Sequence, residues 1–247
     1  MRTLPTHPIS IFNLILTTLR GYVLIFPHIF WLVAISSIGH LIIPYLYLID
    51  PAFAAVGVVG FILLIWFFYT AILDKANTIL LDKPVPNKSI FRLARQRYLW
   101  ILGSNLIFFG IGVFVCLAIF ALNLLFDLVH LHPVYLILSC ILSVSIFVYF
   151  YFAIPDIALE HTSLYKGFEK SVELVRYHWW RTFIVLAFVA AAMLGFEALG
   201  ILFTGKSRLF LFTGYHFLLQ LFFYPLIISV TLVLMNDLKL RRQQEES

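Results

Sequence analysis

Acidic side chains beside long apolar stretches are the residues of this chain best placed to do chemistry. Asp156 and Glu160 are four residues apart, so a helix that continues past Pro155 would put both carboxylates on one face. Paired carboxylates can act as general acid and general base. The alternative, which we expect here, is that a nearby cation holds them in ion pairs that fix the segment. The basic residues that follow are Lys166, Lys170 and Arg176.

Glu197 lies inside an apolar stretch and is the second candidate. An ionisable group inside a bilayer marks a functional site by default, because burying a charge in hydrocarbon is costly. We expect a structural ion pair or a carboxylate that reaches the interface. A proton or substrate site that includes His216 and Gln220 is the alternative. The candidate partners of Glu197 are Lys206, Arg208, His216 and Gln220.

The sequence lacks the usual signatures of metal, nucleotide and hydrolase chemistry. No HExxH, GxGxxG, GxxxxGK[ST] or GxSxG pattern occurs. His130 and His132 stand near Asp127, but no third ligand is evident beside them, so we expect solvated loop histidines. Cys116 and Cys140 fall in apolar stretches, and we expect buried thiols rather than a disulfide. We predict no catalytic residue, no cofactor and no metal site.

The composition requires a lipid environment. Of the 247 residues, 62% are hydrophobic and only 12% are charged, whereas a soluble domain carries about 25% charged residues. Apolar stretches of about 20 residues then predict membrane-spanning helices, whose backbone groups are satisfied internally. The sequence therefore predicts an all-α bundle of six transmembrane helices in a single membrane domain, 1–247. The six stretches are 21–49, 52–73, 99–126, 133–155, 182–204 and 209–235.

The distribution of Lys and Arg predicts the orientation. All of the 17 basic residues except Lys206 and Arg208 lie on the side that carries both termini. The positive-inside rule then places both termini in the cytoplasm of a multi-pass protein of the bacterial inner membrane. The net charge of +5 reflects this topology and contact with the anionic inner leaflet. We therefore expect membrane lipids and other membrane proteins as partners, and no nucleic acid.

Two short motifs recur along the chain and indicate an internal repeat. FYTAILD at 68–74 returns 82 residues later as FYFAIPD at 150–156, and SIFNL at 10–14 resembles SIFRL at 89–93. Similarity at a fixed period is typical of repeat architectures. Chance matches in a chain rich in Phe, Ile, Leu and Tyr are the alternative. The predicted repeats, each a pair of helices, are 9–81, 88–160 and 170–240.

Both copies of the longer motif, FYTAILD and FYFAIPD, end an apolar stretch with an aspartate. A charge costs least at the end of a span, so we expect Asp74 and Asp156 where a carboxylate can reach water. Pro155 lacks a backbone N–H and should break or kink the second copy.

Amphipathic segments follow both copies, at 88–98 and 163–180. We expect them to lie as cytoplasmic helices in the inner headgroup layer, and a helical linker or an extension of the next span is the alternative. The cations expected to contact lipid phosphates are Lys88, Arg92, Arg95, Arg97, Lys166, Lys170, Arg176 and Arg181.

Three segments carry a resemblance to a known family: AIPDIALEHTSLYKGFEKSVELVRYHWWRTF, TLRGYVLIFPHIFWL and VLMNDLKLRR. With them the chain resembles the UPF0259/YciC-like inner-membrane proteins. It is also similar to the DUF975 and DUF6159 types and to the membrane domain attached to some glycerophosphodiester phosphodiesterases. The resemblance covers most of the chain, implies six spans in an inner membrane and supplies no reaction. The matching positions are Pro27, Pro155, Glu160, Ser163, Ser171 and Asp237.

Three functions remain compatible with these features. A non-enzymatic inner-membrane protein that organises envelope lipid or assists other membrane proteins is favoured by the basic amphipathic segments and by the missing catalytic set. A small transporter or channel with a polar site near Glu197 and His216 is the second hypothesis. A membrane-embedded lipid enzyme is the least favoured, because no cluster of carboxylates or histidines is expected at one depth.

Overall fold

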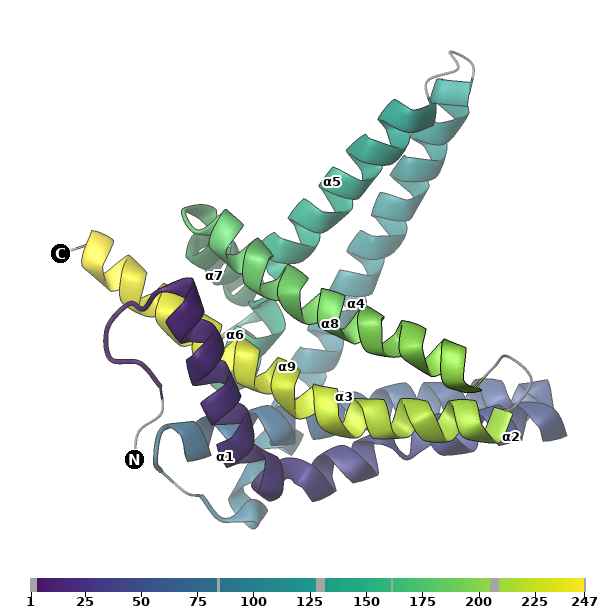
Figure 1. Cartoon of the computed structure of the whole chain (residues 1–247), viewed down its shortest axis with the longest axis horizontal. Helices are drawn as coiled ribbons and strands as arrows, with labels where there is room; N and C mark the ends of the chain where they lie inside the picture. The colour runs from purple at the N-terminus through teal and green to yellow at the C-terminus, as the bar shows by residue number, and fades with distance from the viewer. Residues whose placement is uncertain (1–3, 84, 128–131, 161, 205–208, 247) are drawn as a thin grey trace. The chain divides into compact units, whose positions relative to one another are not determined.

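The regular elements of the chain are α-helices. The computed structural model describes residues 4–83, 85–127, 132–160, 162–204 and 209–246, and no strand occurs within these ranges. The all-α prediction is therefore confirmed. In Figure 1 the helices follow the colour bar from purple to yellow: α1 (Ile11–Ser37), α2 (Gly39–Ile49), α3 (Pro51–Leu80), α4 (Asn87–Asp127), α5 (His132–Phe150), α6 (Ala153–Glu160), α7 (Leu164–Arg176), α8 (Trp179–Thr204) and α9 (Leu209–Glu245).

Six helical stretches among the described residues are long and apolar enough to cross a membrane, as predicted. Several extend beyond the predicted limits, because helix continues into the basic segments. We expected the segment 88–98 to be an interfacial helix, with a helical linker or an extension of the next span as the alternative. It forms the first part of the continuous helix α4. The stretches are Ile11–Ile49, Pro51–Leu80, Asn87–Val115, Ile137–Glu160, Trp179–Leu202 and Thr213–Glu245.

The chain divides into two compact units. Unit 1 comprises Met1–Tyr98 and Trp180–Ser247, and unit 2 comprises Leu99–Trp179. We call the end of a unit at which α3, α5 or α9 finishes its basic end, because the basic segments of the sequence lie there.

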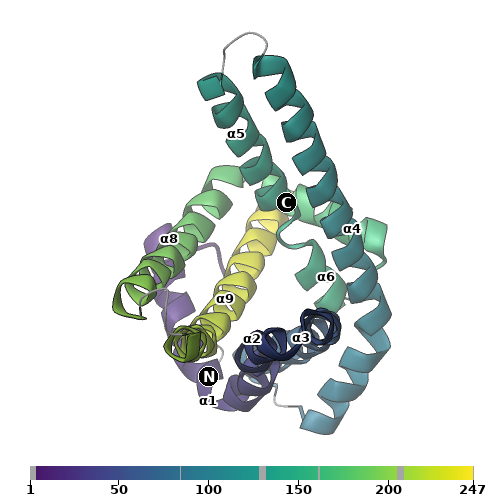
Figure 2. The same ribbon diagram turned by 90° about the vertical axis from the view of Figure 1, so that its right-hand side faces the viewer.

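In unit 1, α1 packs against both α3 and α9, and α2 and α3 lie side by side (Figure 2). Leu14, Ile25 and Ile29 form a fully buried stripe on α1. The Ser229 hydroxyl of α9 donates a hydrogen bond to the Thr18 carbonyl at 2.7 Å. A Cβ at Gly21 would lie 2.7 Å from that hydroxyl oxygen, so glycine permits the close approach of α1 and α9.

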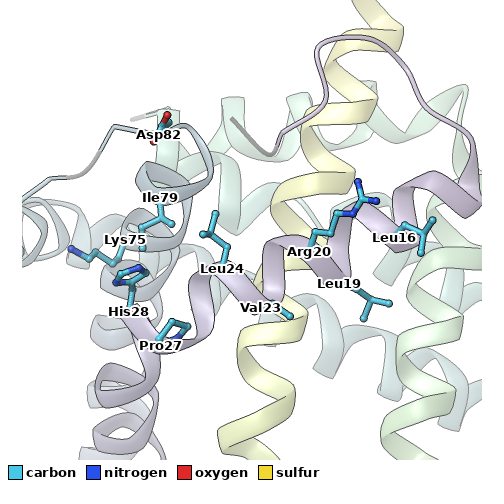
Figure 3. Close-up of a pocket in the computed structure, with 10 residues that line it drawn as sticks. All are labelled: Leu16, Leu19, Arg20, Val23, Leu24, Pro27, His28, Lys75, Ile79 and Asp82. Atoms are coloured by element: carbon cyan, nitrogen blue, oxygen red, sulfur yellow. The ribbon is translucent and has the colours of Figure 1, made fainter. Parts of the chain in front are cut away.

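Helix α1 changes direction at Pro27, as the close-up in Figure 3 shows. Proline lacks the N–H of the helical ladder and its ring collides with the preceding turn, which kinks a helix. Helices α1 and α2 together comprise 39 residues, or about 58 Å at 1.5 Å per residue. A hydrocarbon core of about 30 Å needs about half of that length. The part of α1 before Pro27 is therefore not required for crossing the membrane.

In unit 2 the helix that carries the second motif copy is interrupted, as predicted. Helix α5 ends at Phe150, two turn residues follow, and α6 begins at Ala153 with Pro155 in its first turn. The interruption frees backbone groups that need new partners. Ser171 of α7 is the partner of one freed carbonyl and one freed N–H. Its hydroxyl donates to the Tyr149 carbonyl at 2.7 Å and accepts from the Phe152 N–H at 3.1 Å.

Candidate functional site

Three aspartates lie buried at the basic ends of the two units. Asp74 ends the apolar part of α3, Asp156 lies in the first turn of α6, and Asp237 lies near the end of α9. Their exposed fractions are 8%, 0% and 0% respectively. A buried carboxylate must be paired or hydrogen-bonded to persist as a charge, so the partners of these groups define what they can do.

Asp74 pairs with Arg97 from the first part of α4. The Arg97 Nη1 donates to both carboxylate oxygens, at 3.0 Å to Oδ1 and 3.2 Å to Oδ2. The Arg97 and Asp74 side chains are only 8% and 10% exposed, so water screens the pair little. Next to it, the Lys75 ammonium donates to the Val85 carbonyl at 3.2 Å and ties down the turn between α3 and α4.

Asp156 has a hydroxyl and a lysine as partners. The Thr162 Oγ1 donates to Asp156 Oδ2 at 3.1 Å, and the Lys170 Nζ lies 3.9 Å from the same oxygen. Lys170 also donates to Glu160 Oε2 at 2.9 Å. The expectation that a following cation pairs with the two carboxylates is confirmed at Lys170. It joins α6 to α7, which also meet closely where Gly167 faces Ile157.

Asp237 lies at the centre of a polar cluster in unit 1. It accepts from Arg181 Nε at 2.9 Å, from Arg241 Nε at 3.0 Å and from the Ile9 backbone N–H at 2.9 Å. Both arginines also donate to the Ile9 carbonyl, at 2.5 Å and 2.7 Å. The Asn236 amide donates to the Pro5 carbonyl at 2.9 Å. The cluster holds the N-terminal segment against α8 and α9.

Sequence reasoning placed Asp237 in a family pattern but not in this cluster. The i, i+4 spacing of Asp237 and Arg241 was the one local signal. Ile9 contributes only backbone atoms, and its N–H is 228 residues from Asp237 in sequence. No side-chain pattern could have indicated that contact.

The expectation that Asp74 and Asp156 reach water is wrong. Both are buried, because each meets a donor that replaces water: Arg97 for the first, and Thr162 with Lys170 for the second. Cys140 was expected to be buried and is exposed on α5. The reason is that a span presents apolar side chains to lipid on its outer surface, so an apolar stretch does not predict burial within the protein.

The cations predicted to contact lipid phosphates fall into two groups. Arg97, Lys170 and Arg181 engage carboxylates of the protein, and their contact with lipid phosphates stays a prediction. Burial of the partner aspartates demands this pairing. The remaining members of the set are exposed: Lys88, Arg92, Arg95, Lys166 and Arg176.

The polar residues inside the spans are only partly brought together. His40 of α2 lies near His216 and Gln220, and its ring meets Phe61 edge to face at 5.0 Å. Glu197 makes no hydrogen bond or ion pair with any described residue. Its turn of α8 meets α9 through apolar and aromatic groups, with Tyr215 donating to the Phe196 carbonyl.

Several predicted partners and ligands lie outside the described residues, namely Lys206, Arg208 and His130. His132 is the first residue of α5, and its side chain is not described. Within the described ranges no group of three His, Cys, Asp or Glu side chains could hold a metal ion.

An open groove of about 910 Å³ lies at the basic end of unit 1. Figure 3 shows its walls: the outer face of α1 around the Pro27 bend, and the last turns of α3. The lining is mostly apolar, with charged or titratable side chains at its edges. It comprises Leu16, Leu19, Arg20, Val23, Leu24, Pro27, His28, Lys75, Ile79 and Asp82.

The basic ends thus combine carboxylates that are already paired with cations that remain exposed. Comparison of the chain with models of known protein families, with curated proteins and with solved structures gave no match.

Proposed function

We propose that the chain is a non-enzymatic, multi-pass protein of the bacterial inner membrane that organises envelope lipid or assists other membrane proteins, with both termini in the cytoplasm. One observation carries the proposal. At the basic ends the carboxylates are buried and paired, whereas a separate set of cations stays exposed. The resemblance to UPF0259/YciC-like proteins, which we retain as part of the proposal, leads in the same direction.

The paired carboxylates support a structural role for the acids that were candidates for chemistry. A general base must be free to reach the substrate whose proton it accepts, whereas a carboxylate held in a buried ion pair is already engaged by a donor of the protein. Asp74 and Asp237 each face an arginine, and Asp156 is tied to the Thr162 hydroxyl. These contacts connect helices to one another, as expected of groups that fix geometry.

The exposed cations support contact with anionic lipid. Arg92 and Arg95 lie on the exposed side of the first part of α4, and Lys166 and Arg176 lie at the two ends of α7. Each Lys or Arg near an anionic leaflet contributes about 1 kcal/mol of attraction, and this attraction decays over about one Debye length. A cationic surface of this kind attracts anionic lipids to the protein.

A reconstitution experiment tests the lipid function. The purified full chain is placed in phosphatidylcholine liposomes that contain a minor fraction of fluorescent phosphatidylglycerol. Energy transfer from the protein tryptophans should show the anionic lipid enriched around the protein, with the enrichment falling at high salt. The double variant Arg92→Gln/Arg95→Gln should lower it. Arg242→Gln serves as the control, because Glu246 already accepts from that side chain at 2.7 Å.

Two results would overturn the proposal. One is equal transfer from phosphatidylglycerol and phosphatidylcholine at every salt concentration. The other is transport of a trapped solute or chemical conversion of a lipid by the chain alone, which would favour the transporter or the enzyme hypothesis.

Cysteine labelling tests the proposed orientation. In a background without Cys116 and Cys140, single cysteines at Lys88 and Lys166 should both react with a membrane-impermeant reagent only from the cytoplasmic side. Reaction of the two positions from opposite sides would exclude the topology.

A further inference from the structure

The groove at the basic end of unit 1 is lined by an apolar wall and by a few charged or titratable side chains. Leu19, Val23 and Leu24 supply an apolar wall on α1, and they are 48%, 70% and 37% exposed. In the view of Figure 3, Lys75 and His28 lie at one end of the groove with Asp82 above them, and Arg20 lies farther along α1, before Leu19 and Leu16. A site for a soluble small molecule usually encloses most of its ligand, whereas this groove is open along the helices.

The depth of the groove follows from helix lengths. The turn between α2 and α3 at Asp50 is the common outer reference for both helices. A span of about 20 residues crosses the hydrocarbon core. Counting back from Ile49 along α2 and α1 reaches His28 after about 22 residues, and counting forward from Pro51 along α3 reaches Lys75 after about 25 residues. Two independent helices therefore place this end of the groove at the opposite headgroup boundary.

The bend at Pro27 explains why the wall is apolar and yet lies outside the core. Figure 3 shows that α1 changes direction at Pro27. With His28 at the headgroup boundary, we expect the residues before Pro27 to run along the interface. Residues spaced by three and four then share one face, which is why Val23 and Leu24 line the groove together with Leu16 and Leu19. An exposed apolar face at interface depth is complementary to acyl chains.

We propose that this groove binds one anionic glycerophospholipid of the cytoplasmic leaflet, with an acyl chain along the α1 wall and the phosphate at Lys75 and His28 or at Arg20. The inference rests on the proposed function and its orientation, and it adds a defined site. The lining carries Arg20 and Lys75 against Asp82 alone, a formal net charge of +1 with His28 neutral. A lipid with one negative charge and no amine balances that charge, whereas a zwitterionic lipid does not.

Native mass spectrometry of the full chain tests the site. The protein is equilibrated in micelles with phosphatidylglycerol or with phosphatidylcholine of the same acyl chains, and the lipid retained after stepwise delipidation is measured. The wild type should retain one phosphatidylglycerol per chain and should retain phosphatidylcholine about tenfold less well, because the choline cation of phosphatidylcholine offsets the attraction between its phosphate and the cations of the groove.

Variants locate the binding. Arg20→Gln tests the cation farther along α1 and the double variant His28→Gln/Lys75→Gln tests the end at which those two side chains lie, and at least one should weaken phosphatidylglycerol retention about tenfold. Arg242→Gln is the matched control, since Glu246 already accepts from that side chain at 2.7 Å and Arg242 does not line the groove. Val23→Asn in the apolar wall should shorten retention of both lipids, and circular dichroism of each variant verifies that the helices are intact.

The outcomes separate this inference from the proposed function. If both Arg20→Gln and His28→Gln/Lys75→Gln retain phosphatidylglycerol as well as the wild type does, or if the control loses it equally, the groove is not the site. General enrichment of anionic lipid around the protein would survive that result. Equal retention of phosphatidylcholine and phosphatidylglycerol by the wild type would overturn the charge argument and the site together.

Discussion

The two copies of the recurring motif reach the same state of burial by different means. In FYTAILD, α3 runs unbroken through Asp74, which meets one arginine through both carboxylate oxygens. In FYFAIPD the helix is interrupted before Pro155, and Asp156 meets a threonine and a lysine. The comparison teaches that the motif specifies a buried aspartate at the end of a span, and that the segment after it supplies the partner.

The cost of losing each aspartate should differ most strongly. Asp74→Ala leaves Arg97 buried without its carboxylate, and breaking such a pair costs about 3–5 kcal/mol. Asp156→Ala should cost less, about 1–3 kcal/mol, because Lys170 is 40% exposed and keeps Glu160 as a partner. Unfolding of both variants in mixed micelles, followed by far-ultraviolet circular dichroism, measures the difference.

A double variant sharpens this first prediction. Asp74→Leu/Arg97→Met removes both charges together, and replacing a buried pair by apolar residues is often neutral. It should be more stable than Asp74→Ala. Equal losses from Asp74→Ala and Asp156→Ala would mean that the two partner sets hold their aspartates equally well.

Exchanging the proline should break the comparison at the backbone. Leu73→Pro places a proline in the first copy at the position that matches Pro155, and inside the unbroken α3 it should cost about 3 kcal/mol or more. The reverse change Pro155→Leu should cost much less, because α6 already begins at Ala153. Thermal unfolding of the two variants in detergent is the measurement, and a Leu73→Pro variant as stable as the wild type would contradict the account of the break.

The matching serines should respond unequally. Ser171→Ala removes the hydroxyl that serves both Tyr149 and Phe152, and leaving buried backbone groups without a partner costs about 1–3 kcal/mol. Ser89 occupies the matching position, 82 residues earlier, and its hydroxyl donates only to the nearby Pro86 carbonyl. Ser89→Ala should therefore change stability by about 0.5 kcal/mol or less. Amide hydrogen exchange at 149–153 should accelerate in Ser171→Ala alone.

Neutralising Glu160 should have the smallest effect. The Lys170 and Glu160 side chains are 40% and 36% exposed, so solvent screens their attraction, and the pair contributes about 0–1 kcal/mol. Glu160→Gln should leave the denaturation midpoint nearly unchanged at moderate salt. A loss as large as that of Asp156→Ala would show that Glu160, rather than Thr162, holds α6 and α7 together.

The sequence predicted the parts of the structure that depend on composition and local pattern. The six apolar stretches lie in six helical stretches of spanning length, because the backbone in hydrocarbon must satisfy its hydrogen bonds internally. Pro155 predicted an interruption because a missing N–H acts locally. Lys170 was among the expected partners of Asp156 and Glu160 because it follows Glu160 by only 10 residues. The exposed cations Arg92 and Arg95 follow from the amphipathic pattern of 88–98.

Contacts between distant segments were not accessible in this way. The cluster at Asp237 includes Arg181, 56 residues away in sequence, and the Ile9 backbone, 228 residues away. No local sequence pattern indicates contacts over such separations. The groove needs both the bend at Pro27 and the last turns of α3, and these two parts meet because α1 packs on α3. Glu197, the polar residue that sequence favoured within the spans, meets none of the described candidate partners.

The sequence by itself determined that this protein has six stretches long and apolar enough to span a bilayer and that the helix is interrupted next to Pro155, because hydrophobic length and a missing N–H are local properties. The tertiary structure decided which charged side chains are paired within the protein and which stay exposed. Asp74, Asp156 and Asp237 are buried because cations or hydroxyls from other segments replace water around them. Pairing depends on the meeting of separate helices, and no stretch of one helix contains that information.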